Sequence, residues 1–200
     1  RKQDCLRQLY DVKTLLNRKD TRMYDVANKV GRYYYEKGDV VKAREYFVSA
    51  FNSVKDSRKK NYRHDAICYN LYLTYMNLMS SADSLKYKEE FIKEFWPNIA
   101  ITLDTDSGDT PASKKGMQGR YHLLKYEDWS YESLYSIFGY NQRLLGKPKH
   151  ITVEKDGIIQ SYYFGNRIGA NIDVKCIDEA EKIAIIDKYK TLKESNHEIY

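Results

Sequence analysis

The sequence predicts an α+β protein that is mostly helical, with antiparallel helical hairpins followed by a small antiparallel strand meander with flanking helices. Three observations support this fold class. Apolar residues recur at helical intervals through most of the first 97 residues. Short β-branched runs between residues 151 and 177 are separated by turn residues, which is typical of strands. Helical spacing of apolar residues then returns after residue 178.

These patterns divide the chain into three segments. Residues 1–97 form a predicted helical domain, and residues 120–200 form a small α+β unit of helix, three-strand meander and helix. Between them, residues 98–119 read NIAITLDTDSGDTPASKKGMQG. Because this stretch is rich in Thr, Asp, Ser and Gly, we interpret it as a loop or linker.

Five helices are expected in the helical domain. Their ranges are Asp4–Leu16, Thr21–Glu36, Asp39–Val54, His64–Met79 and Leu85–Phe95. The first is expected to pack under the second, and Trp96-Pro97 closes the last, since proline cannot continue a helix.

The second and third of these helices form the most informative unit. Lys37-Gly38-Asp39 separates them, with Gly38 suited to ending one helix and Asp39 to capping the next. Gly31 lies where two helices would approach closely, and the return helix carries small and aromatic residues at helical spacing. These are Ala43, Phe47 and Ala50. The pattern predicts an interlocking hairpin that needs neighbours to bury its apolar face.

This hairpin resembles a tetratricopeptide repeat. The matching positions are Gly31, Tyr34, Gly38, Ala43, Phe47 and Ala50, with Val30 in place of the usual Leu. Ala27 replaces the usual Trp and Lys55 the terminal Pro, so both ends depart from the pattern. A second unit aligns only with a shift of 41 residues, which puts Ser84 and Lys88 opposite Ala43 and Phe47. The resemblance covers one good repeat and one degenerate repeat.

The resemblance implies a scaffold that binds a protein or peptide and performs no catalysis. A repeat of this family presents the inner helix of each hairpin to a concave surface. On the matched unit that helix carries Asn28, Lys29, Arg32 and Tyr35, whose basic and amphipathic side chains suit an acidic peptide or a carboxylate. Self-association would extend so short an array.

Charge is distributed unevenly along the chain. The overall net charge is +6, but residues 1–70 hold 17 Lys or Arg against 9 Asp or Glu. The excess peaks in a basic patch of Lys55, Arg58, Lys59, Lys60 and Arg63. We interpret this patch as a solvated connection. A basic nucleic-acid-binding adaptor is a further alternative that we consider unlikely, since no groove-reading motif accompanies the charge.

The C-terminal unit is expected to begin with a Tyr-rich helix near residues 129–138. A hairpin follows, in which the turn Lys155-Asp156-Gly157 joins Ile151–Val153 to a strand at Ile158–Phe164. Asn171–Ile177 alternates apolar and polar residues and is the third expected strand. Asp178 and Glu181 have the spacing of a capping box that starts the last helix.

The sequence specifies no reaction, cofactor or metal. Asp104, Asp106 and Asp109 alternate like calcium ligands, but Gly and Glu are not where a calcium loop needs them. His64 and Cys68 lie four residues apart, yet the apolar surroundings of Cys68 and the odd number of cysteines favour reduced, packed thiols. We therefore expect a polar loop and a core cysteine.

A second function class stays open. An enzyme or enzyme accessory domain would place its site between the helical part and the strand meander, near a polar cluster of His122, Tyr126 and Asp128. With 42% apolar and 31% charged residues, the composition is ordinary for a soluble globular protein, and no apolar run could cross a bilayer. A cytoplasmic location is slightly favoured, and secretion after signal removal stays open.

Overall fold

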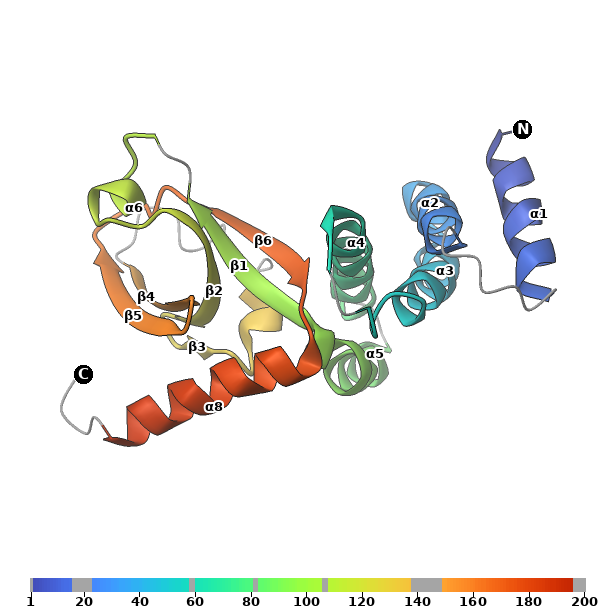
Figure 1. The fold of residues 1–200 in the computed structure, drawn as a ribbon. Helices are drawn as coiled ribbons and strands as arrows, with labels where there is room; N and C mark the ends of the chain where they lie inside the picture. Colours follow the sequence, from blue (N-terminus) through green and yellow to red (C-terminus); the bar gives the residue numbers. More distant parts are fainter. Residues whose placement is uncertain are drawn as a thin grey trace. The chain divides into compact units, whose positions relative to one another are not determined.

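The computed structural model describes residues 2–15, 23–57, 60–80, 83–105, 108–137 and 149–195 (Figure 1). The chain divides into two compact units, Arg1–Ile99 and Ala100–Tyr200, each of which is treated by itself below. None of the helices in these described ranges is both long and apolar enough to cross a bilayer.

The first unit consists of helices close to the predicted ranges. They are α1 (Lys2–Leu15), α2 (Met23–Glu36), α3 (Val40–Asn52), α4 (Tyr62–Leu78) and α5 (Ser84–Glu90). A π-helical turn (Phe91–Phe95) and a 3-10 turn (Trp96–Asn98) follow α5. Leu16 and the start of the second predicted helix lie outside the described residues. As expected, α1 packs on α2, and the Arg7 guanidinium donates to the Tyr34 hydroxyl at 3.0 Å.

The α2–α3 turn forms as the sequence predicts. Gly38 has a φ of +79°, a conformation that glycine adopts without steric cost. The Asp39 carboxylate accepts a hydrogen bond from the Lys42 backbone N–H at 3.1 Å, which caps α3. This pair of residues reverses the chain and brings the two helices together.

Close packing between α2 and α3 depends on Gly31 and Phe47. A Cβ atom placed on Gly31 would lie 2.7 Å from two carbon atoms of the Phe47 ring, closer than side chains pack. Phe47 is 1% exposed, so its ring has little room to move aside. The predicted close approach is therefore confirmed, and the Phe47 ring is the group that covers the glycine.

Tyrosine and phenylalanine side chains join α3 and α4 to the helical segment that follows. The Tyr75 ring centroid lies 5.3 Å from that of Phe91 and 5.1 Å from that of Phe95. Its hydroxyl accepts from Arg44 Nε at 2.8 Å, and Arg44 also pairs with Glu90. Burial raises the pKa of Tyr75 well above its usual range. Tyr75 and the equally buried Tyr72 therefore serve the core of this unit, whereas Tyr62 and Tyr69 of the same helix are exposed.

Cys68 corrects one expectation for this unit. It is fully buried in α4, but it is disulfide-bonded. The interpretation as a reduced packing thiol was therefore wrong. The spacing of apolar residues along α4 predicts that Cys68 is buried. Spacing within one helix cannot predict that its sulfur forms a disulfide. Cys5 is exposed and is a free cysteine.

The second unit is built on a six-stranded sheet with strand order β5-β4-β2-β1-β6, in which β3 pairs with β2. The strands are β1 (Ile99–Thr105), β2 (Gly119–Tyr126), β3 (Trp129–Ser130), β4 (Lys149–Lys155), β5 (Ile158–Phe164) and β6 (Asn171–Cys176). The helices are α6 (Pro111–Lys114) and α8 (Glu179–Ser195), with a 3-10 turn at Leu134–Ser136. Figure 1 shows the sheet curving strongly, with α8 lying beside it.

Several predicted features of this unit are confirmed. β4 and β5 pair antiparallel across the Asp156-Gly157 turn, where both residues have positive φ values of 50° and 79°. β6 occupies the predicted alternating segment, and its last residue, Cys176, is disulfide-bonded. The Asp178 carboxylate accepts from the Ala180 backbone N–H at 3.0 Å and so caps α8.

Three expectations for this unit were wrong. The segment 98–119 is not one long loop, because its buried residues Ile99–Leu103 form most of strand β1. The expected helix near residues 129–138 is instead the short strand β3 and a 3-10 turn. The sheet is larger than a three-strand meander, since β6 lies beside β1. β-branched residues in the run IAITL favour a strand, and the sheet supplies its partners.

Replacing Gly31 with Ala should lower the free energy of unfolding. The added methyl group would overlap the Phe47 ring, and overpacking of this kind costs about 1–3 kcal/mol. Alanine regains about 1 kcal/mol of helix propensity, so the net loss is smaller than the overlap alone. Urea unfolding would measure it, with Lys29→Ala on the exposed face of α2 as the control. A G31A protein more stable than wild type would contradict the close approach.

Candidate functional site

The first unit contains a small groove between α2 and α4. A hollow of about 60 Å³ is lined by Arg32, Tyr35, Glu36, Phe47, Asn70 and Leu73. We call this feature the α2–α4 groove. Two of the four predicted partner-binding residues, Arg32 and Tyr35, line it directly. The third, Asn28, accepts a hydrogen bond from Asn70 Nδ2 at 2.9 Å. Lys29 is exposed and is not one of the lining residues.

The charge at the groove is carried mainly by Arg32. Its guanidinium lies 3.8 Å from the Glu36 carboxylate, and the two side chains are 61% and 67% exposed. An exposed pair at this distance contributes little stability, so it can rearrange when another carboxylate approaches. Phe47 connects the groove to the hairpin core, because the same ring that lines the groove covers Gly31.

The basic patch is partly committed to the fold. Lys60 Nζ donates to the backbone carbonyl groups of Val54 and Lys55, which closes the turn after α3. Arg63 Nη1 pairs with the Asp25 carboxylate at 2.9 Å and joins α4 to α2. Arg58 and Lys59 lie outside the described residues. Lys60 and Arg63 therefore have structural roles, and a role in nucleic-acid binding is not needed to account for them.

The aspartates considered as calcium ligands and the His64–Cys68 pair do not form a metal or catalytic site among the described residues. Asp104 belongs to β1 and pairs with Arg120 at 3.0 Å, while Asp109 pairs with Lys114 at 3.1 Å. Asp106 lies outside the described residues. Cys68, being disulfide-bonded, offers no thiolate for His64 to activate. In the described part of the chain, no three His, Cys, Asp or Glu side chains come together in a group that could hold a metal ion.

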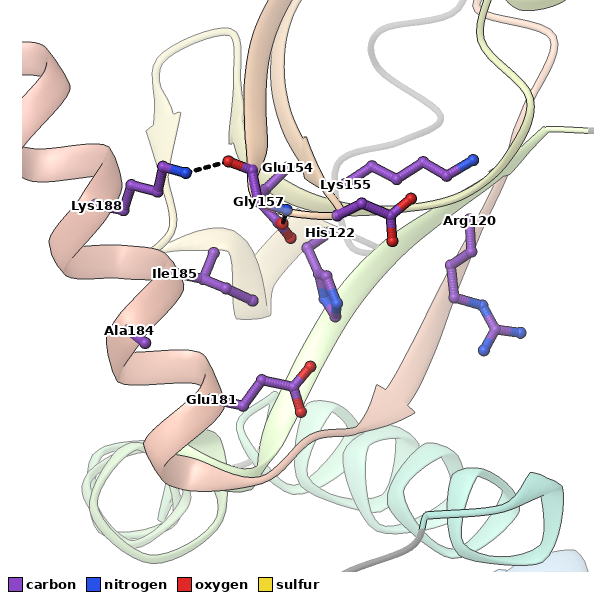
Figure 2. Close-up of a pocket in the computed structure, with 10 residues that line it drawn as sticks. Arg120, His122, Glu154, Lys155, Gly157, Glu181, Ala184, Ile185 and Lys188 are labelled. Carbon is purple, nitrogen blue, oxygen red and sulfur yellow. Dashed lines mark hydrogen bonds between the residues drawn. The ribbon is translucent and has the colours of Figure 1, made fainter.

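A larger pocket lies in the second unit, between the sheet and α8 (Figure 2). Its volume is about 480 Å³, and we call it the β2–α8 pocket. Its lining residues are Arg120, His122, Glu154, Lys155, Asp156, Gly157, Glu181, Ala184, Ile185 and Lys188. The sequence analysis missed this pocket. Only His122 had been singled out there as a site residue.

The predicted cluster of His122, Tyr126 and Asp128 does not form. The pairing of β2 with β4 shifts register between Leu123 and Lys125, and Tyr126 then lies opposite the buried Ile151. His122 lies opposite Glu154 and lines the pocket instead. Because neighbouring residues of β4 point to opposite faces, His122 and Tyr126 belong to different sides of the sheet. That part of the enzyme hypothesis was wrong.

A polar row crosses the sheet where the pocket lies. Thr102 of β1 pairs with His122 of β2, which pairs on its other side with Glu154 of β4. Residues directly opposite each other in antiparallel strands share a face, so these side chains are neighbours. Within the described structure, Thr102 Oγ1 and His122 Nδ1 are buried without a hydrogen-bond partner. A buried polar group in this state is costly, so it calls for an explanation.

The polar groups around the row already hold the β4–β5 turn in place. The Glu154 carboxylate accepts from the Gly157 backbone N–H at 2.6 Å. Lys188 Nζ donates to the Gly157 carbonyl oxygen, and Lys155 Nζ donates to that of Gln118 at 2.5 Å. Both lysines bond to neutral carbonyl groups there, and Lys155 Nζ also lies over the Tyr121 ring, 5.1 Å from its centroid.

Comparison with known proteins adds no family. No protein-family profile matches the chain, and no curated protein or solved structure is significantly similar to it. The resemblance to tetratricopeptide repeats therefore stays a prediction that depends on the matched residues.

Protonation of His64 should destabilise the first unit. Burial, with a smaller effect of Lys60, lowers the pKa of His64 below its ordinary value. The unfolded chain therefore binds the proton first, and stability should decline as pH falls through about 6.5 toward the folded-state pKa. His64→Phe retains an aromatic ring against Tyr24, whose centroid lies 5.6 Å away, and cannot titrate. Denaturant unfolding at pH 7.5 and 5.5 should show that the free energy of unfolding falls less in His64→Phe than in wild type. Equal losses in the two proteins would contradict the assignment of this pH dependence to His64.

Proposed function

We propose that this protein is a binding scaffold whose helical unit holds an acidic protein or peptide segment in the α2–α4 groove. The observation that carries the proposal is the grouping of Arg32, Tyr35 and Asn70 around one hollow. Residues from two helices that are far apart in sequence contribute a cation, an aromatic ring and an amide. Such a combination suits a partner with carboxylate groups and peptide bonds.

The side-chain amides favour a peptide as the partner. Asn28 and Asn70 use one amide N–H and one carbonyl oxygen in the bond between them. An asparagine amide has two N–H donors and an acceptor oxygen, so each retains further capacity for hydrogen bonding. Peptide groups have the same donors and acceptors. An extended segment lying across the groove could therefore pair with the Asn70 amide that lines it, while Arg32 meets a carboxylate.

The size of the groove limits the strength of this interaction. A hollow of about 60 Å³ admits one side chain or a terminal carboxylate rather than a whole ligand. Affinity from a single site of this size would be modest, and an oligomer or a longer array would raise it through multivalency. The resemblance to a repeat family, whose members use several stacked units, supports the same expectation.

Charge reversal at two positions of α2 tests the proposal. Arg32→Glu should weaken binding of an acidic peptide at least about tenfold, because it replaces the groove cation with an anion. Lys29→Glu makes the same change in net charge on the same helix, outside the groove lining, and should have a smaller effect. Fluorescence polarisation with labelled acidic and basic decapeptide pools at 50 mM and 200 mM salt would measure both.

Three results would count against the scaffold. If neither peptide pool binds, a peptide is not the partner. If the two variants lose affinity equally, the interaction depends on net charge and not on the groove. Tighter binding of single-stranded DNA than of the acidic pool, with a steep salt dependence, would favour the nucleic-acid alternative. Circular dichroism of R32E and K29E should match wild type, because both residues are exposed.

A further inference from the structure

The β2–α8 pocket has the features of a ligand site that the scaffold proposal does not use. It lies wholly within the second unit and is about 480 Å³ in volume. Small-molecule sites commonly have volumes of about 300–1,000 Å³. Thr102 Oγ1 and His122 Nδ1, on neighbouring strands, are buried without a partner among the described residues. The His122 ring is one of the groups that line the pocket, and an imidazole can donate or accept a hydrogen bond.

The charges that line the pocket are balanced. Three basic residues, Arg120, Lys155 and Lys188, line it with three acidic ones, Glu154, Asp156 and Glu181. The Arg120 guanidinium also pairs with Asp104 at 3.0 Å, so charges of both signs remain in nearly equal number. A ligand with a large net charge would face repulsion from one of these sets. A ligand with one positive and one negative end could pair with both. The balance therefore favours a zwitterion over a phosphate or a polyamine.

The order of residues on α8 determines the orientation in which a zwitterion would bind. Glu181, Ala184, Ile185 and Lys188 line the pocket at spacings of three, four and seven residues, which places them on one face of the helix. The face thus runs from an acid through an apolar middle to a base. In Figure 2, Glu181 lies at one end of this face and Lys188 at the other, beside Gly157, with His122 projecting between them from the sheet.

The separation of the two ends sets the length of the ligand. Seven residues of α-helix span about 10 Å, and an ion pair of roughly 3 Å at each end shortens the distance that the ligand itself must bridge. In a free amino acid the ammonium and carboxylate groups share one carbon atom, so they cannot reach both ends together. Two extended residues span at most about 7 Å, which fits the remaining distance better.

We propose that the β2–α8 pocket binds a dipeptide with free termini. Its ammonium group pairs with Glu181 and its carboxylate with Lys188, while Ala184 and Ile185 contact apolar side chains. The peptide bond lies beside the His122 ring, which lines the pocket between these two ends. This inference does not depend on the α2–α4 groove, since the two sites share no residue.

Capped forms of one dipeptide test the assignment of its ends. Calorimetric titration with Ala-Leu should show binding at least about tenfold tighter than with N-acetyl-Ala-Leu, Ala-Leu-amide or free leucine. Each cap removes one charge and therefore one of the two end contacts. Absence of binding at about 10 mM would overturn the proposal and leave water as the occupant of the pocket. Equal affinity for the capped forms would overturn it too, as would tighter binding of free leucine.

Two substitutions then assign each end to a residue. Glu181→Gln should abolish the preference for the free over the acetylated N-terminus while retaining the preference for the free C-terminus. Lys188→Met should do the reverse. Glu179→Gln and Lys193→Met change the same residue types at exposed positions of α8 outside the lining and should leave both preferences intact. Loss of both preferences in each pocket variant, with unchanged circular dichroism, would contradict the assignment of the ends.

Discussion

Contact between Gly31 and the Phe47 ring determines how the helical unit is assembled. The ring occupies the space that any other side chain at position 31 would fill, so α2 and α3 pack with their backbones close together. The same ring lines the α2–α4 groove. Packing of the hairpin and the shape of the proposed binding surface therefore depend on one residue. Phe47 can satisfy both because α3 packs on α2 and also on α4.

In the second unit the corresponding constraint is the register between β2 and β4. The shift between Leu123 and Lys125 puts His122 and Tyr126 on opposite faces of the sheet. Before the shift, His122 shares a face with Glu154 and lines the β2–α8 pocket. After it, Tyr126 is buried opposite Ile151. Irregular pairing of this kind changes which side chains reach a given face, so it can bring polar groups to a site.

The two candidate sites are built by different means. The α2–α4 groove joins helices through long side chains and exposed charges, which suits a partner that is itself extended and adaptable. The β2–α8 pocket is bordered by the β4–β5 turn, whose backbone N–H and carbonyl groups are hydrogen-bonded to Glu154 and Lys188. A turn held in this way keeps the pocket open before a ligand arrives, which lowers the entropic cost of binding. One chain could therefore combine a contact surface for macromolecules with a site for a small molecule.

Local patterns in the sequence determined the helices of the first unit and α8, the Asp39 and Asp178 caps and the Asp156-Gly157 turn, because each depends on residues close together in the chain. They also placed Arg32 and Tyr35 on one face of a helix. Only the tertiary structure decided that β6 pairs with β1, that Ile99–Thr105 is a strand, and that His122 meets Glu181 and Lys188 around one pocket. Strand pairing and pocket formation join residues tens of positions apart. Periodicity within one segment carries no information about which distant segment will satisfy its hydrogen bonds or cover its apolar face.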